Sequence, residues 1–314
     1  MNDFSIVIYD DSHFDLWNDF VATAANSTFL FDRNFMDYHR ERFDDFSLMI
    51  FDNNSLIAVL PAHRTGAELR SHSGLTYGGL CVGPKTDIMQ HRLYWQALLS
   101  FLKKRQIDRL TVKVLPVFYA CEWVNQFRYL AFQLGGVLSS SELNLCVDYN
   151  DYAISKSKLK HDRKSGKYPL QIVEDDDLSA FWQSVLVPLL QERYQTKPVH
   201  SLEEISKLQR AFPNKIRQFS VYYQSEIVAG ITVFEFEAGV KSQYGAATSL
   251  GKELRALDHL FIYLIQKYGA AGKRFFDMGV VSDSSDLGFN AGLLQQKREL
   301  GCTTYLQDII EFEL

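Results

Sequence analysis

Two charged side chains in the last forty residues could take part in catalysis. Asp277 lies in the apolar stretch FFDMG, and Lys297 lies in the helix-like stretch GLLQQKRELG, Gly292–Gly301. A carboxylate can orient an amine or take its proton, and an ammonium can stabilise an oxyanion or bind phosphates. Together they could serve a reaction in which an amine loses a proton and an oxygen gains negative charge. The alternatives are that Asp277 caps a turn and that Lys297 is a solvated lysine beside Arg298.

A basic segment, KSKLKHDRKSGK at Lys156–Lys167, could bind an anionic substrate. It contains six Lys or Arg residues and one Asp, which gives it a local net charge of +5. The phosphates of a nucleotide-linked acceptor or of a tRNA would be attracted to it, and Lys160, Arg163 and Lys164 are the candidate binding residues. A solvated linker is the alternative. The segment is not a phosphate-binding P-loop, because its first glycine is missing and Tyr168 replaces the final Ser or Thr.

The sequence gives no sign of metal or disulfide chemistry. The four cysteines are scattered without a CxxC pair, and the eight histidines include no HExxH motif. This pattern predicts free thiols and no metal site. A GxSxG nucleophile elbow is also missing.

The composition is that of an ordinary globular protein. The chain has 314 residues, of which 46% are hydrophobic and 23% charged, and a formal net charge of −5. Such a charge argues against a protein that is basic over its whole surface. The N-terminus is acidic, and the apolar runs are too short for a membrane span. We therefore expect a cytoplasmic protein without a transmembrane helix.

The two halves of the chain repeat a pattern that would position these residues. A hairpin pattern, FSLMIFDNNSLIAVLP from Phe46, returns as FSVYYQSEIVAGITVF from Phe219. Other matches follow in the same order at offsets of 165 to 167 residues: Trp17 with Trp182, Tyr77 with Tyr244, and Arg109 with Arg274. Several matches at a nearly constant offset indicate an internal duplication.

Each half reads as strand, helix, helix, hairpin, strand, long helix and two further strands. The long helices are the clearest elements, because Leu257–Tyr268 and Tyr94–Leu102 each place apolar residues on one helical face. The sequence thus predicts an α/β (α+β) fold of two lobes, 1–150 and 151–314. Each lobe would have a mixed, mainly antiparallel sheet flanked by helices.

This order of elements resembles the GNAT fold of N-acyltransferases. A tandem pair of such units resembles the Fem family of peptidoglycan-bridge aminoacyltransferases. The residues that carry the resemblance are the basic segment 156–167, the passage from Gln243 to Gly279, and the closing GLLQQKRELG, with LIAVLPAHRTG and LTYGGL in the first half. Two features depart from the pattern. Gln296 stands before the signature lysine where an aromatic residue is usual, and Ser249–Ala256 has only Gly251 in place of the glycine-rich loop that cradles coenzyme A.

The resemblance implies roles for further residues. Tyr244, at the end of a strand that would splay from its neighbour, could donate a hydrogen bond to the tetrahedral intermediate or to the leaving group. Tyr77, its counterpart in the first half, would line the acceptor side. We expect Tyr244, Asp277 and Lys297 to be the catalytic residues. The alternative for Tyr244 is an aromatic residue on a half-buried strand.

Three functions remain open from the sequence. The first is an N-acyl or aminoacyl transferase that modifies an amine of a cell-envelope or polysaccharide precursor. The second is an acyl-CoA-dependent acyltransferase for a sugar or small-molecule amine, and the third is a catalytically silent module that binds a saccharide or peptide. Acyl-CoA or aminoacyl-tRNA would be a co-substrate rather than a permanently bound cofactor. The acceptor would be a small molecule or a nucleotide-linked compound, and tRNA could bind at 156–167.

Overall fold

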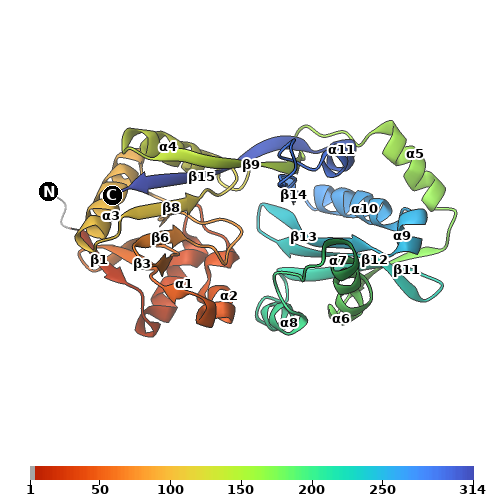
Figure 1. Ribbon diagram of the computed structural model, residues 1–314, viewed down its shortest axis with the longest axis horizontal. Helices are drawn as coiled ribbons and strands as arrows, with labels where there is room; N and C mark the ends of the chain where they lie inside the picture. The colour runs from red at the N-terminus through yellow and green to blue at the C-terminus, as the bar shows by residue number, and fades with distance from the viewer. Residues whose placement is uncertain (1–3) are drawn as a thin grey trace. The chain divides into compact units, whose positions relative to one another are not determined.

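The computed structural model describes residues 4–314, apart from the side chains of residues 193 and 194. The chain divides into two compact units (Figure 1). The first comprises residues 1–142 and 306–314, and the second comprises residues 143–305. The sequence placed the boundary after residue 150 and the C-terminus in the second lobe. The structure differs because the last strand pairs with a strand of the first unit.

The first unit contains the predicted order of elements with a few additions. Its helices are α1 (Phe14–Thr23), α2 (Arg33–Met36), α3 (Ile88–Lys104) and α4 (Cys121–Gln133). Its strands are β1 (Phe4–Ile8), β2 (Asp44–Asp45), β3 (Leu48–Asp52), β4 (Ser55–Leu60), β5 (His63–Thr65), β6 (Glu68–Ser71), β7 (Cys81–Val82), β8 (Arg109–Lys113) and the start of β9 (Val137–Asp148). Strands β3 and β4 form the predicted hairpin, with Asn53 in the left-handed region at its turn.

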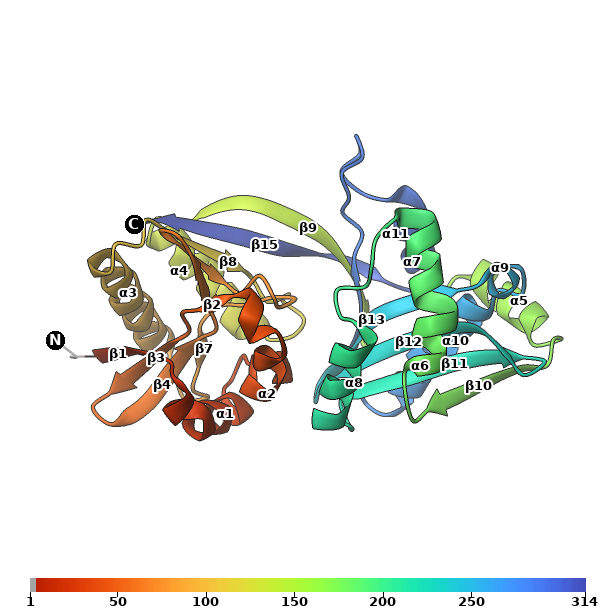
Figure 2. The ribbon, with the colours of Figure 1, turned by 60° about the horizontal axis from the view of Figure 1, so that its bottom comes forward.

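The second unit repeats this order. Its strands are the end of β9, β10 (Leu170–Asp175), β11 (Ile216–Tyr223), β12 (Glu226–Glu235), β13 (Gly239–Ala247), β14 (Phe275–Val280) and the start of β15 (Thr303–Glu313). Its helices are α5 (Lys156–Ser165), α6 (Ser179–Phe181), a π-helical turn (Trp182–Leu186), α7 (Val187–Tyr194), α8 (Leu202–Ala211), α9 (Ser249–Glu253), α10 (Ala256–Ala270) and α11 (Ala291–Glu299). Helices α6 to α8 cover one face of the sheet and α10 covers the other (Figure 2).

Strands β13 and β14 of the second unit separate partway along their length. Strand order is β10-β11-β12-β13-β14-β9, with antiparallel neighbours except β13 and β14. The parallel pairing of β13 with β14 covers three residue pairs and ends at Lys241 and Asp277. Beyond this point β13 continues to Ala247, and a bulge beside Thr232 gives it one extra residue, Gln243. Such a separation exposes backbone and side chains between the strands.

The two repeats exchange their last strands. The end of β9, a strand that starts in the first unit, pairs with β14 inside the second unit. Conversely β15 pairs with β8 inside the first unit. The core of the second unit joins Leu145 and Val147 of β9 to apolar residues of β11 to β14 and α10. Each repeat therefore completes the sheet of the other.

Candidate functional site

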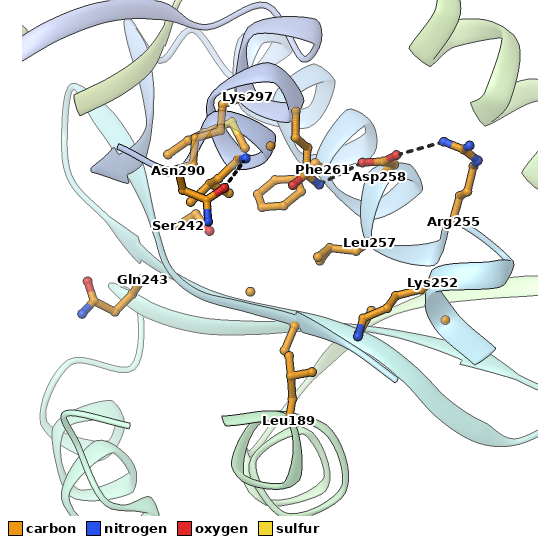
Figure 3. A pocket seen from close by; sticks show the side chains of 18 residues that line it. Leu189, Ser242, Gln243, Lys252, Arg255, Leu257, Asp258, Phe261, Asn290 and Lys297 are labelled. Atoms are coloured by element: carbon orange, nitrogen blue, oxygen red, sulfur yellow. Dashed lines mark hydrogen bonds and ion pairs between the residues drawn. The ribbon is translucent and has the colours of Figure 1, made fainter. Parts of the chain in front are cut away.

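A pocket of about 680 Å³ opens in the second unit where β13 leaves β14 (Figure 3). Its wall is formed by β13, by α9 and the first half of α10, and by α11, with one residue each from α7 and β14. Its lining residues are Leu189, Ser242, Gln243, Gly245, Ala246, Ala247, Gly251, Lys252, Arg255, Leu257, Asp258, Phe261, Met278, Asn290, Gly292, Leu293, Gln296 and Lys297. The wall thus combines apolar side chains with a few charged ones, as small-molecule sites do.

Lys297 lines this pocket although its side chain is buried. Its ammonium donates to the backbone oxygens of Gly279, at 2.9 Å, and Val280, at 3.1 Å. Burial first, and then the neighbouring Lys241, lower the pKa of Lys297 from 10.5 to about 8. The lysine still carries its proton at neutral pH, so it can act as a cationic hydrogen-bond donor.

Asp277 lies next to Lys297 but is fully buried and does not line the pocket. One carboxylate oxygen forms an ion pair with Lys241 at 3.2 Å, and the other accepts from the backbone N–H of Gly279 at 2.7 Å. Gly279 therefore links the two residues, because its N–H binds Asp277 and its oxygen binds Lys297. The structure brings these two predicted residues together through this one glycine.

Tyr244 lies apart from them. Its neighbours Gln243 and Gly245 line the pocket, whereas the Tyr244 ring packs edge-on against Trp182, with centroids 4.9 Å apart. Its hydroxyl lies 2.6 Å from Nδ1 of the buried His200. Burial raises the pKa of Tyr244 to about 12, so the phenol is protonated and can donate to the imidazole.

The first-unit residue Tyr77 is fully buried, and its hydroxyl donates to Thr28 Oγ1 at 3.1 Å. A counterpart of the second-unit pocket lies beside it, between Gly78–Gly79, α3, α4 and the end of β8, but it measures only about 20 Å³. The ring of Trp95 on α3 stacks on Phe127 of α4, with centroids 4.7 Å apart. Stacked aromatic rings therefore line this small cavity.

The basic segment forms helix α5, capped by Ser155. Lys160, Arg163 and Lys164 are exposed on it. Lys158 instead points inward, and its ammonium lies 2.7 Å from Asp258 Oδ2 at the start of α10. Helix α5 lies against the pocket wall, because its Lys158 and the pocket residue Arg255 both contact the carboxylate of Asp258.

A polar network in the wall of the pocket was missed in the sequence. Asp258 accepts from Lys158 and from the Gln296 amide, at 3.1 Å. Arg255 lies 3.8 Å from the same carboxylate (Figure 3). Lys241 was missed as well. A lysine inside a central strand is a usable signal, because lysine is rarely buried without a partner. Lys158 and Asp258 are a hundred residues apart in the sequence, so no local pattern shows that they pair.

The loop that would hold coenzyme A has a different structure here. Ser249–Glu253 is the short helix α9, and Thr248 caps it by accepting from the N–H of Gly251 at 3.0 Å. A side chain at Gly251 would lie 2.0 Å from the backbone oxygen of Val228. This glycine therefore permits close packing on β12, and its amide is occupied by the cap.

In the part of the chain that the structure describes, no group of His, Cys, Asp and Glu side chains is arranged to hold a metal ion. None of the helices within residues 4–314 combines the length and the apolar character needed to cross a bilayer.

No family model matches the chain, and no curated protein matches it. Solved structures with a similar fold do exist. A crystal structure of FemX covers 99% of this chain and 97% of its own, with a TM-score of 0.67 at 11% identity. The structure of L-PGS from Bacillus licheniformis covers 97% and 92%, with a TM-score of 0.62 at 12% identity. A tandem GNAT protein from the clavulanic acid biosynthesis pathway covers 99% and 98%, with a TM-score of 0.53 at 14% identity. The chain has the Fem-like tandem GNAT fold, which confirms the fold class expected from the sequence.

Proposed function

We propose that this protein is an acyltransferase that passes an aminoacyl or other acyl group to an amine of a cell-envelope or polysaccharide precursor. The observation that carries the proposal is Lys297, a buried lysine in the wall of the second-unit pocket whose side-chain nitrogen donates to two backbone oxygens. The likeness in fold to FemX, L-PGS and the tandem GNAT protein supports the general reaction class. Fold alone does not determine function, so the argument rests on the site.

The reaction would join the acceptor nitrogen to the acyl carbon. The amine attacks the carbonyl, the carbonyl oxygen becomes an oxyanion, and the bond to the leaving oxygen or sulfur then breaks as the amide forms. The ammonium of Lys297 has three protons, of which two are bound to the backbone oxygens of Gly279 and Val280. The third can form a hydrogen bond to the oxyanion, and the ammonium keeps this proton when the intermediate collapses. The proton lost by the amine leaves with the departing group.

The donor that we propose is an aminoacyl-tRNA. Lys252 and Arg255 give the pocket a cationic edge, and α5 adds the exposed Lys160, Arg163 and Lys164. Positive charge spread in this way suits a phosphate-rich ligand. An acyl-CoA is disfavoured because the pyrophosphate cradle is replaced by α9, whose Gly251 is used for packing.

Transfer assays with the purified full-length chain test the proposal. Radiolabelled aminoacyl-tRNAs and acetyl-CoA are compared as donors, with a panel of UDP-linked amino sugars and peptides as acceptors. We expect transfer from aminoacyl-tRNA. We also expect Lys297→Met to lower kcat by about 10²–10³, the usual cost of removing an oxyanion donor, with a smaller change in KM.

Lys273→Met is the matched control. Like Lys297, Lys273 donates to two backbone oxygens, those of Phe236 and Glu237; it also pairs with Glu235 at 3.1 Å, and it does not line the pocket. Its loss should leave kcat unchanged. A Lys297→Met protein with the wild-type rate would refute the role of this lysine, and transfer from acetyl-CoA alone would refute the donor.

A further inference from the structure

Three charged side chains are buried together at the end of β14. They are Lys241 on β13, Asp277 on β14 and Lys297 on α11, with exposed fractions of 7%, 0% and 6%. Charged groups are rarely buried to this extent unless they pair, because losing their hydration costs several kcal/mol. The arrangement of these three side chains therefore requires an explanation beyond ordinary packing.

The carboxylate of Asp277 fixes the backbone that holds Lys297. Its Oδ1 accepts from the N–H of Gly279, and its Oδ2 binds the Lys241 ammonium. Gly279 has a φ of 77°, in the left-handed region that favours glycine. This turn presents the backbone oxygens of Gly279 and Val280 to the Lys297 ammonium. The position of Lys297 thus depends on the turn, and the turn depends on Asp277.

Opposite charges act on Lys297 from different elements. Among the described residues these charges belong to Lys241 of β13 and Asp277 of β14, and the thiol of Cys302, which follows α11, is a further titratable neighbour. Lys241 favours the neutral form of Lys297, and Asp277 favours the charged form. Burial raises the pKa of Cys302 to about 12, so the thiol is neutral at ordinary pH. The cluster then has two ammonium groups for one carboxylate.

We propose that Lys241 and Asp277 are positioning residues for Lys297. Asp277 holds the turn at Gly279, whose backbone oxygens bind the Lys297 ammonium. Lys241 maintains an excess positive charge that an oxyanion or other anionic group in the pocket balances. The role of the pair in transfer rests on the proposed function. Its effect on Lys297 does not, because it concerns the free protein.

The test measures the pKa of Lys297 in the full-length chain by NMR of protein labelled with [13Cε]lysine, without any substrate. The resonance of Lys297 is identified by its absence from Lys297→Met. Removing the repelling charge in Lys241→Met should raise the pKa, and removing the attracting charge in Asp277→Asn should lower it. Each change should alter the proton affinity by about tenfold.

The double variant Lys241→Met/Asp277→Asn removes both members of the Lys241–Asp277 ion pair, so neither is left buried without the other, and it remains informative if a single variant does not fold. Because this variant removes one repelling and one attracting charge, its Lys297 pKa should lie between those of the two single variants. Lys273→Met should match the wild type. An unchanged pKa in both Lys241→Met and the double variant would overturn the proposal.

Transfer rates separate this proposal from the proposed function. If the protein is the proposed transferase, the pH at which transfer declines should shift in the same order as the pKa of Lys297. If the pKa values follow the order above but no donor supports transfer, the positioning pair stands and the proposed function fails. A decline that stays at one pH in all variants would show that the pair does not act on catalysis.

Discussion

Three histidine side chains are buried together in the first unit. The ring of His72 lies with its centroid 4.7 Å from that of His63 and 5.7 Å from that of His39, and Phe43 packs against all three. Burial, and then the neighbouring His63, lower the pKa of His72 to about 3. The native protein therefore keeps this imidazole neutral at any pH above about 4.

The neutral state of His72 should make the protein sensitive to acid. In the unfolded chain a histidine binds a proton below about pH 6.5, so stability that is complete above this pH is lost as the pH falls toward 3. For His72 alone the loss between pH 7 and pH 5 is about 2 kcal/mol. Urea unfolding at pH 7 and at pH 5 should show this loss of stability.

His72→Phe should be less stable than the wild type at pH 7, by about 1 kcal/mol, because it lacks the hydrogen bond that Nδ1 accepts from Gly74. Its stability should also depend less on acid. An equal loss in both proteins would contradict this.

Individual site residues differ in how far the sequence could predict them. Lys297 could be chosen because a local pattern, GLLQQKRELG, surrounds it. Asp277 and Lys297 meet only because Gly279 turns the chain with a positive φ, and sequence spacing does not show such a contact. The hydroxyl of Tyr244 binds His200, a partner that lies 44 residues earlier in a loop. Its catalytic role stays a prediction.

At the scale of elements, the structure of α9 limits how well the pocket can bind coenzyme A. A pyrophosphate needs free backbone N–H groups and a close approach to the chain. Here Thr248 occupies the amide of Gly251, and the glycine is packed against β12.

We therefore expect acetyl-CoA to bind no more tightly than about 100 μM, which corresponds to about −5.5 kcal/mol. Calorimetric titration of the full-length chain measures this directly. A dissociation constant in the low micromolar range would contradict the prediction and make acyl-CoA the leading donor.

Helix α5 combines a structural lysine with exposed cations. Lys158 holds the helix to Asp258 at the start of α10, which leaves Lys160, Arg163 and Lys164 free to meet a ligand. From the sequence alone, this segment was interpreted as a single basic run. A helix places successive residues on different faces, so one lysine of the run became buried while the others stayed exposed.

Replacing Lys160, Arg163 and Lys164 together by Ala should weaken the binding of tRNA and reduce its dependence on salt. Each lost phosphate contact lowers the slope of log K against log salt by about 0.7 for single strands. Filter binding at several salt concentrations measures both effects. The matched control replaces the exposed Lys103, Lys104 and Arg105 by Ala, which removes the same charge from the first unit. Equal losses in the two triple variants would indicate a response to net charge alone.

The elements themselves were largely predictable. The long helix of the second unit was expected at Leu257–Tyr268 and is α10, and the hairpins were expected from Phe46 and Phe219 and are β3–β4 and β11–β12. Periodicity and turn residues act over a few positions, so one sequence suffices to find them. Strand pairing joins distant segments, and the sequence therefore could not show that β9 and β15 exchange partners.

At the scale of the whole molecule, this exchange determines which part of the chain can fold alone. The second unit is the continuous segment 143–305, because the end of β9 supplies its last strand. Residues Leu145 and Val147 of that strand belong to its core. A fragment that starts after β9 lacks them and leaves β14 without this antiparallel neighbour.

We expect residues 143–305 to fold as an independent unit and residues 151–314 to remain largely unfolded. The two fragments have nearly the same length, so the comparison isolates the exchanged strand. The longer C-terminus of the second fragment does not compensate, because residues 309–313 pair with β8 in the first unit and would leave an unpaired, aggregation-prone strand. Circular dichroism and urea unfolding should show a cooperative transition for 143–305 alone. A cooperative transition in 151–314, without one in 143–305, would mean that the strands of each repeat stay with their own half.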